Sequence, residues 1–200
     1  PAKTRIVANG RKVEVLQNGQ VVESVPDVNP LDFVKAYQAK FKVPPYQGLP
    51  RFTGGLAGYF GYDTVRYIER RLADTVKADA IQVPDVLLMV SEELAVVDNL
   101  SGKLYFIVYA DPSEPKAYEK AHARLADLIQ RLRKSVSIPE AQPMPPAQAK
   151  SEFGESEFKA AVEKAKRYIF DGDIMQVVLS QRMSQPFSAP PLSLYRALRS

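Results

Sequence analysis

The 200-residue chain contains no cysteine and no tryptophan, and it has a single histidine, His122. Without cysteine, a thiolate nucleophile, a disulfide and a cysteine-ligated zinc are all excluded, which fits a reducing compartment. The chain also lacks an apolar run near the roughly 18 residues that a membrane span needs, and it shows no pattern of a secretory leader. We therefore expect a cytoplasmic protein that does not enter a membrane.

The charge pattern gives no sign of a nucleic-acid partner. There are 27 Lys and Arg residues against 23 Asp and Glu residues, a net charge of +4, and the two signs are interleaved along the chain. A nucleic-acid binder normally combines a basic stripe with a recognisable module, and neither pattern occurs here. A hydrophobic content of 46% is enough for a real core. The composition thus predicts a globular protein without nucleic acid.

Both ends of the sequence read as interior positions of a longer protein. The chain begins with Pro1, close to a strand pattern, and stops at Ser200 inside PLSLYRALRS, a stretch that reads as the start of a helix. Pro191 suits the first turn of that helix, and no glycine or later proline ends it. We expect the sequence to be part of a larger chain.

The first third of the sequence predicts three antiparallel strands followed by a helix. Residues 4–25 contain two Asn-Gly pairs, Asn9-Gly10 and Asn18-Gly19, between β-branched runs. Asn-Gly accepts the positive φ angles of tight hairpins. The helix predicted over residues 29–41 has Asn29 as its cap and an apolar stripe that would pack on the sheet.

The glycine-rich stretch GGLAGYFGYD, residues 54–63, invites comparison with a phosphate-binding loop. Its glycines lack the spacing of the dinucleotide fingerprint, and no Lys-Ser or Lys-Thr follows as in the P-loop. We interpret it as a strand whose missing side chains let aromatic groups or another backbone approach, with a ligand contact as the alternative. A short helix over residues 64–72, capped by Asp63 or Thr64, is expected next.

Two apolar runs and a long helix follow. The runs at residues 84–98 and 103–110 predict a hairpin that turns at residues 99–102, and their almost unbroken hydrophobicity predicts burial on both faces. Residues 115–134 form the clearest amphipathic helix pattern. His122 lies beside its apolar stripe, where packing is favoured over catalysis because the pattern supplies no partner acid.

A proline-rich stretch predicts the boundary between two structural parts. Prolines cannot donate to a sheet ladder or continue a helix, so we interpret residues 139–150 as a linker between an N-terminal and central α+β part, 1–138, and a second part, 151–200. The second part predicts a helix over residues 156–173, ended by a left-handed Gly172. That helix end also accounts for Asp171 and Asp173 without a metal site.

GDIMQVVLSQRM, residues 172–183, follows as a predicted strand with one unexpected residue. Gln176 shares a face with Ile174 and Val178. Pattern alone favours a solvated glutamine on an edge strand. The alternative is a polar pocket with apolar walls, lined by Gln176, Ser180 and Arg182.

Two stretches carry a resemblance to a known family. GGLAGYFGYDTVRYIE and YIFDGDIMQVVLSQR, together with the order of elements around them, resemble the chorismate-utilising enzymes, and within them the anthranilate synthase large subunits. The resemblance covers essentially the whole chain. It implies an α+β fold of large antiparallel sheets packed face to face with outer helices, incomplete in this chain, whose residues 151–200 would begin the chorismate-binding part.

The resemblance also implies a reaction and its partners. Chorismate would be converted to anthranilate and pyruvate in tryptophan biosynthesis, with Mg²⁺ as cofactor, ammonia from a glutamine amidotransferase subunit and tryptophan as feedback inhibitor. The family's tryptophan-site motifs, magnesium-binding glutamates and catalytic histidine would lie outside Pro1 to Ser200. No catalytic or metal-binding residue is therefore expected in this chain, which we expect to be inactive by itself.

The resemblance gives Gln176 a specific meaning. In the isochorismate and salicylate branch, the matching strand carries a lysine at this position as the base that activates water. A glutamine amide cannot take a proton at neutral pH, which fits an enzyme whose nucleophile is ammonia and disfavours isochorismate synthase. Gln176 would face chorismate and donate hydrogen bonds, while Arg182 would hold a carboxylate or a structural acid.

Two other readings stay open at the level of the sequence. One is the large subunit of aminodeoxychorismate synthase, which shares the fold and adds ammonia elsewhere on the ring. The other is a non-catalytic regulatory or assembly module whose sheets bind a partner or an effector. Residues beyond Ser200 would separate these readings.

Overall fold

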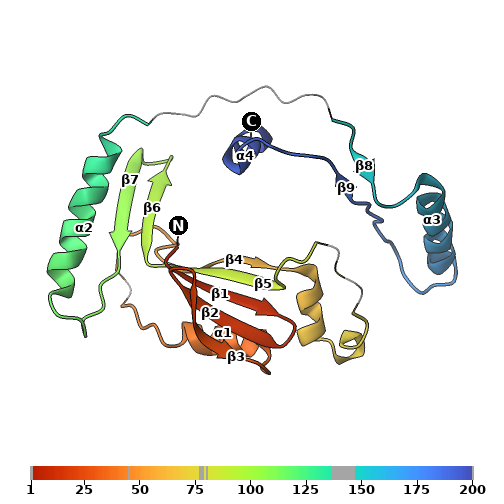
Figure 1. Ribbon diagram of the computed structural model, residues 1–200, viewed down its shortest axis with the longest axis horizontal. Helices are drawn as coiled ribbons and strands as arrows, with labels where there is room; N and C mark the ends of the chain where they lie inside the picture. Colours follow the sequence, from red (N-terminus) through yellow and green to blue (C-terminus); the bar gives the residue numbers. More distant parts are fainter. Residues whose placement is uncertain (1, 45, 77–78, 80, 137–146, 200) are drawn as a thin grey trace. The chain divides into compact units, whose positions relative to one another are not determined.

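The computed structural model describes residues 2–44, 46–76, 79, 81–136 and 147–199. The chain divides into two compact units, Pro1–Ser135 and Val136–Ser200, whose elements are labelled in Figure 1. Each unit is described by itself. Residues 139–146 of the predicted linker lie outside the described residues, so the linker stays a prediction.

The N-terminal unit begins with the three predicted antiparallel strands. They are β1 (Thr4–Asn9), β2 (Lys12–Gln17) and β3 (Gln20–Val25), paired in sequence order. Asn18 and Gly19 form the second turn with φ angles of 51° and 87°, the positive values that a two-residue hairpin with the right-handed twist requires. The hairpin prediction is confirmed.

The sheet gains two further antiparallel strands, β5 (Val86–Ser91) and β4 (Gly55–Phe60), to give the order β3-β2-β1-β5-β4 (Figure 1). Its core uses alternate residues of three strands, as a sheet with one covered face should. The buried cluster consists of Ile6, Ala8, Val13, Val15, Val86 and Leu88. The core therefore lies across β2, β1 and β5.

Helix α1 (Pro30–Gln38) supplies part of the cover for this core. Its stripe residues Phe33, Val34 and Tyr37 pack against the buried cluster. Asn29 caps the helix as predicted, because its side-chain oxygen accepts a hydrogen bond from Leu31 N at 2.9 Å. The helix ends three residues before the predicted limit.

Strand β4 confirms the interpretation of the glycine-rich stretch. A Cβ atom on Gly58 would lie 2.0 Å from the Leu87 carbonyl oxygen, and one on Gly54 would lie 2.4 Å from the Tyr109 ring. A Cβ atom on Gly61 would make a less severe contact, 3.1 Å from the Asp85 carbonyl oxygen. These glycines are needed because backbone and aromatic atoms occupy the space of a side chain.

The short helix after β4 differs from its prediction. Tyr62–Tyr67 forms a 3-10 helix, η1, and Arg70–Leu72 a second one, η2. The residue at the N-cap is Gly61, so the predicted cap at Asp63 or Thr64 is wrong. The Thr64 hydroxyl instead donates to the Gly61 carbonyl at 2.7 Å. The Asp63 carboxylate accepts hydrogen bonds from Arg66, which is described below.

The apolar run at residues 84–98 is two strands that belong to different sheets. β5 joins the five-stranded sheet, whereas β6 (Glu93–Asp98) pairs only with β7 (Lys103–Val108) among the described residues. The predicted hairpin at 99–102 is confirmed for β6 and β7. The prediction that both faces are buried is wrong for β6 and β7. Alternate residues of β6 are exposed, and among the described residues no second layer covers the β6–β7 pair.

The unit ends with α2 (Ala117–Leu132), which packs on β7. In the second unit, β8 (Lys150–Ser151) precedes α3 (Glu155–Phe170), and β9 (Met183–Ser184) precedes α4 (Pro191–Arg199). Gly172 has φ +81° and ends α3 as predicted. None of residues 147–199 is buried.

The strand predicted over residues 172–183 is wrong for most of its length. Only Met183 belongs to a strand, β9, which pairs with β8. A strand is held by hydrogen bonds to a neighbour, and among the described residues no ladder pair includes residues 174–181. Met175 and Val178 are consequently 96% and 88% exposed.

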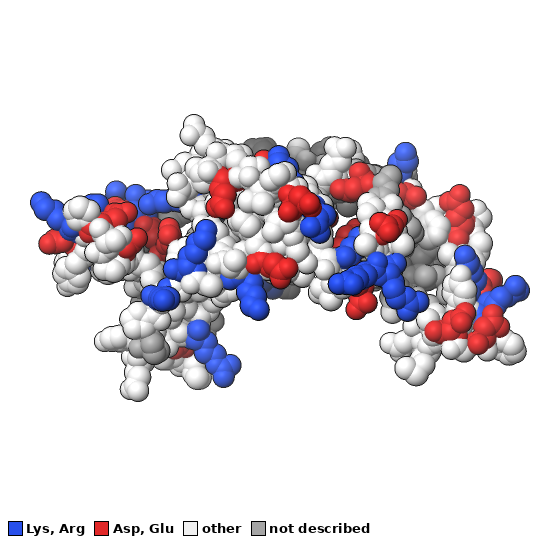
Figure 2. Space-filling view, turned by 90° about the horizontal axis from the view of Figure 1, so that it is seen from below, with Lys and Arg blue, Asp and Glu red and all other residues white. Residues whose placement is uncertain are grey.

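The surface charges agree with the sequence pattern. Figure 2 shows Lys and Arg side chains interleaved with Asp and Glu over the face in view, without a stripe of one sign. None of the described helices is long and apolar enough to cross a membrane. The α+β class with antiparallel sheets is confirmed.

Replacing Gly58 with Ala tests the close approach of β4 to β5. The added Cβ would overlap the Leu87 carbonyl and push the paired strands apart, so we expect a loss of about 2 kcal/mol in the free energy of unfolding. Chemical denaturation of the full-length protein measures it. Gly102→Asn is the control, because Gly102 has φ +65° and open space around it and asparagine tolerates that conformation. Equal stability of G58A and the parent would contradict the close-approach account.

Candidate functional site

Gln176 lies on the segment that leads from α3 back to β9, which we call the return segment and define as residues 173–182. The Gln176 side chain is exposed, and Ile174 and Leu179 are the half-buried residues of the segment. Because 174 and 179 differ in parity, the predicted alternation of an apolar and a polar face is not formed here. The described part of the chain leaves the amide in solvent.

Arg182 lies at the far end of the return segment and contacts an acid. Its Nε donates to Glu152 Oε2 at 2.6 Å, and the Glu152 backbone N donates to the Arg182 carbonyl at 3.0 Å. The hydrogen bond from Arg182 holds the pKa of Glu152 below its usual range. Of the two partners considered for Arg182, the one present in the structure is a structural acid.

Gln176 and Arg182 are therefore on one segment but are not brought together. The end near Arg182 carries a further side-chain contact, in which the Ser151 hydroxyl and Gln181 Oε1 lie 2.7 Å apart. At its other end, near Gln176, the return segment begins directly after Gly172, the residue that ends α3. Sequence reasoning missed Glu152 and Ser151, because each lies 30 positions from its partner in the sequence.

A second polar cluster, which the sequence did not reveal, surrounds Asp85 in the N-terminal unit. Asp85 Oδ2 accepts a hydrogen bond from Gly10 N at 2.7 Å and lies 2.8 Å from the Tyr67 hydroxyl. That hydroxyl is also 2.8 Å from the Gly10 carbonyl. Asn29 Nδ2 donates to the Tyr67 carbonyl at 3.1 Å. The cluster joins the first hairpin turn, η1 and the start of β5.

The environment of Tyr67 changes its acidity. Burial, followed by the hydrogen bond with Asp85, raises the pKa of Tyr67 well above its usual range. A phenol held in its neutral form donates to the acceptors around it and does not act as a base at neutral pH. Tyr67 is suited to hold elements together rather than to transfer protons.

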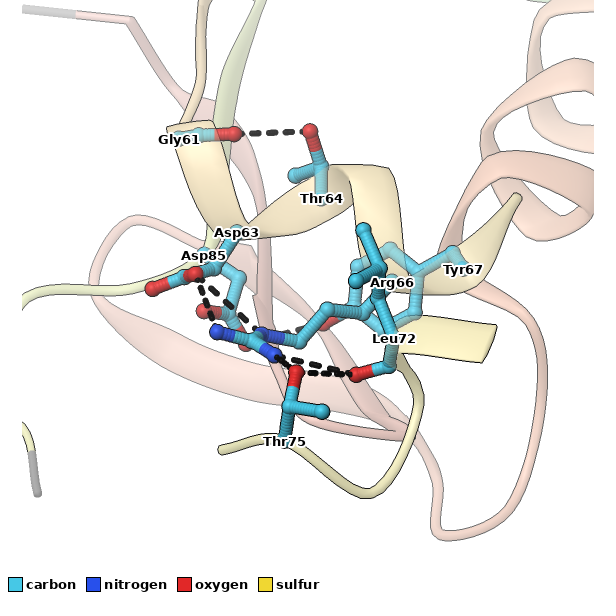
Figure 3. Close-up of polar contacts among 8 residues, drawn as sticks. All are labelled: Gly61, Asp63, Thr64, Arg66, Tyr67, Leu72, Thr75 and Asp85. Atoms are coloured by element: carbon cyan, nitrogen blue, oxygen red, sulfur yellow. Dashed lines mark hydrogen bonds and ion pairs between the residues drawn. The ribbon is translucent and has the colours of Figure 1, made fainter. Parts of the chain in front are cut away.

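Arg66 organises the loop next to Tyr67, as Figure 3 shows. Its Nη2 donates to Asp63 Oδ1 at 2.8 Å, and its Nη1 donates to the Leu72 carbonyl at 3.0 Å and to the Thr75 hydroxyl. The Arg66 side chain is only 18% exposed. Because its donors are directed to the protein itself, Arg66 fixes η1 against η2.

An open groove lies between the β5–β6 junction and α2. Arg124 from α2 crosses it and makes two hydrogen bonds of 2.9 Å to Glu93. The hydrogen bond from Arg124 lowers the pKa of Glu93, and Arg131 lowers that of Asp127 nearby. The paired charges link α2 to β6 and neutralise much of the groove.

His122, for which packing was predicted, is exposed on α2, with its ring 6.2 Å from that of Tyr118. Asp171 and Asp173 flank the Gly172 helix end. Across the described residues, no group of three His, Asp or Glu side chains is placed to hold a metal ion. The structure thus offers no internal ligand set for Mg²⁺ within those residues.

Replacing Tyr67 with Phe tests the Asp85 cluster. Loss of the hydroxyl removes its contacts with Asp85 and Gly10, so we expect the free energy of unfolding to fall by about 1 kcal/mol. Because the Tyr67 pKa is raised on folding, this stabilisation is present below the ordinary tyrosine pKa of about 10 and is lost as the pH rises above it. Y67F should therefore lose less stability than the parent between neutral and alkaline pH.

Tyr62→Phe, at a residue 95% exposed, is the control. A parallel pH dependence of Y67F and the parent would contradict the prediction.

Comparisons with known proteins place these features in a family. Residues 2–200 match the family described as chorismate binding enzyme. The chain is 55% identical over 203 residues to anthranilate synthase component 1 of Neisseria gonorrhoeae and 46% identical over 205 residues to that of Pseudomonas aeruginosa. All of this chain is covered in both cases, and it spans 41% and 42% of the two relatives.

A solved structure supports the fold. The crystal structure of anthranilate synthase component I from Streptococcus pneumoniae TIGR4 matches with a TM-score of 0.77 and 31% sequence identity. The match covers 100% of this chain and 43% of that one. Because the family match extends over residues 2–200 and the fold agrees with it, the chain belongs to the chorismate binding enzyme family.

Proposed function

We propose that this chain is part of an anthranilate synthase large subunit. The full-length protein would convert chorismate and ammonia to anthranilate, pyruvate and water in the biosynthesis of tryptophan. The observation that carries the proposal is identity of 55% and 46% to two proteins named anthranilate synthase component 1, each over the whole of this chain. The α+β fold with antiparallel sheets supports it.

The chemistry at position 176 agrees with an ammonia-dependent reaction. Addition of water to the chorismate ring needs a base that removes a proton from water, and an amide has no basic lone pair at neutral pH. Gln176 can donate and accept hydrogen bonds without taking a proton. Ammonia already carries the lone pair that attacks the ring, so we propose that Gln176 faces chorismate and suppresses the addition of water.

The cofactor and partners follow from the same proposal. Mg²⁺ would be the cofactor, held by residues outside this chain, as the family resemblance implies. A glutamine amidotransferase subunit would deliver ammonia, and tryptophan would inhibit the enzyme as its end product. The enzyme would work in the cytoplasm.

The 200-residue chain by itself should not form anthranilate. It spans about two fifths of its relatives, and residues 147–199 bury none of their side chains. The test incubates the purified chain with chorismate, Mg²⁺ and ammonium and follows anthranilate fluorescence, with the full-length protein as positive control. Turnover by the isolated chain would overturn the placement of the catalytic residues outside it.

Replacing Gln176 with Lys in the full-length protein tests the proposed role of the amide. A lysine amine at this position supplies the missing base, so we expect isochorismate as a new product and anthranilate formation reduced about tenfold or more. Products are separated and quantified by chromatography. Ser180→Lys, which places an amine four residues along the same segment, is the matched control and should form no isochorismate. Unchanged products and rates in Q176K would return Gln176 to a solvated, non-functional role.

A further inference from the structure

The first hairpin turn carries a chemically reactive pair, Asn9 and Gly10. In such a pair the glycine backbone nitrogen can attack the asparagine side-chain carbon Cγ, because glycine has no Cβ to hinder the approach. The new N–Cγ bond closes a five-membered succinimide while the Cγ–Nδ2 bond breaks. Ammonia leaves with the electron pair of the broken bond and with the proton of the glycine nitrogen. Water then opens the ring to aspartate or to isoaspartate.

The geometry of the turn favours glycine at position 10. Gly10 has φ +56°, a backbone conformation that residues with a side chain rarely adopt. An added Cβ would meet no atom within 4 Å, so the backbone conformation and not the available space selects the glycine. The reactive pair is therefore a consequence of the hairpin turn itself, and its protection has to come from the contacts that the turn makes.

The Asp85 carboxylate holds the nitrogen that would attack. Its Oδ2 accepts a hydrogen bond from Gly10 N at 2.7 Å. For the attack, the Gly10 nitrogen must lose its proton and the peptide must rotate toward Asn9 Cγ. The hydrogen bond opposes the rotation because it has to break first. The negative charge of the carboxylate opposes the loss of the proton, since it disfavours a second negative charge beside it.

The backbone of Asp85 keeps the carboxylate in place beside the turn. Asp85 N donates to the Ala8 carbonyl at 2.9 Å, and the Asp85 carbonyl accepts from Gly61 N at 2.7 Å. On the other side of the same turn, the Tyr67 hydroxyl lies 2.8 Å from the Gly10 carbonyl. The position of residue 85 therefore does not depend on its side chain, and the carboxylate can be removed without releasing its backbone.

We propose that Asn9 is a deamidation site and that Asp85 protects it by binding the Gly10 N–H. Asn9 is the last residue of β1 and lies opposite Lys12 in the β1–β2 ladder. Isoaspartate at this position adds one carbon to the main chain, which separates Gly10 from Asp85 and disturbs the end of the ladder. The inference concerns the lifetime of the folded protein and does not rest on the proposed function.

Removal of the carboxylate in the full-length protein tests this role. We expect Asp85→Ala to raise the deamidation rate of Asn9 about tenfold, because a hydrogen bond to a charged group is lost. The protein is incubated at mildly alkaline pH and digested with trypsin, which places Asn9 and Asn18 in separate peptides, residues 6–11 and 13–35. Chromatography with mass spectrometry measures isoaspartate in each. Asn18 is the internal control, because general unfolding would accelerate both sites, whereas loss of the carboxylate should accelerate Asn9 alone.

Two further variants separate the hydrogen bond from a local loosening of the turn. Tyr67→Phe removes the hydroxyl contacts of the cluster but keeps the bond from Gly10 N to Asp85, so Asn9 should react within about twofold of the parent rate. Asp85→Asn keeps an acceptor oxygen without the charge and should give an intermediate rate.

Three results would overturn the proposal. One is an unchanged rate at Asn9 in Asp85→Ala, and another is an equal increase in Tyr67→Phe. The third is a slower reaction in Asp85→Ala, which would mean that the carboxylate removes the Gly10 proton as a base and promotes the attack. The parent protein unfolded in urea gives the unprotected rate, and Asn9 should react there about tenfold faster than in the folded protein.

Discussion

Strand β5 holds the N-terminal unit together, because it hydrogen-bonds to β1 on one side and to β4 on the other. In the strand order of the sheet, β5 lies between the first hairpins and β4. Val86 and Leu88 of β5 belong to the buried cluster, and Asp85 immediately before the strand accepts hydrogen bonds from Gly10 in the first turn and from Tyr67 in η1. Burial and polar contacts therefore converge on one short segment.

The second unit is organised by a different constraint. It buries none of its described residues, so polar contacts give it shape: the hydrogen bonds that end α3 at Gly172, the i,i+4 pair of Glu155 and Lys159, and the Glu152–Arg182 ion pair beside β8 and β9. Such exposed polar contacts individually stabilise little. Together they connect the two ends of the segment that carries Gln176 to α3 and to β8.

These two kinds of order bear on function in different ways. The glycines of β4 resemble a ligand-binding loop in composition, yet Gly58 is required by the backbone of β5 and Gly54 by the ring of Tyr109. Arg66, Arg124 and Arg182 likewise direct their guanidinium groups to acids of the same chain. The chemistry proposed for this chain rests instead on Gln176, whose side chain is exposed.

Local signals in the sequence determined much of the fold. The Asn-Gly pairs have the φ preference of tight turns, Asn29 caps α1, and Gly172 ends α3, because each depends on the residue and its near neighbours. Gln176 was likewise singled out by its place in an apolar run and by the family resemblance.

The tertiary structure alone decided which strands pair beyond the predicted hairpins. The run at residues 84–98 reads as one strand, but its halves join different sheets, and residues 174–182 have strand composition without a partner strand among the described residues. The Glu152–Arg182 and Tyr67–Asp85 contacts also required the fold, since they join residues 30 and 18 positions apart. Strand pairing and long-range polar contacts depend on what lies alongside, which the pattern of a single segment does not encode.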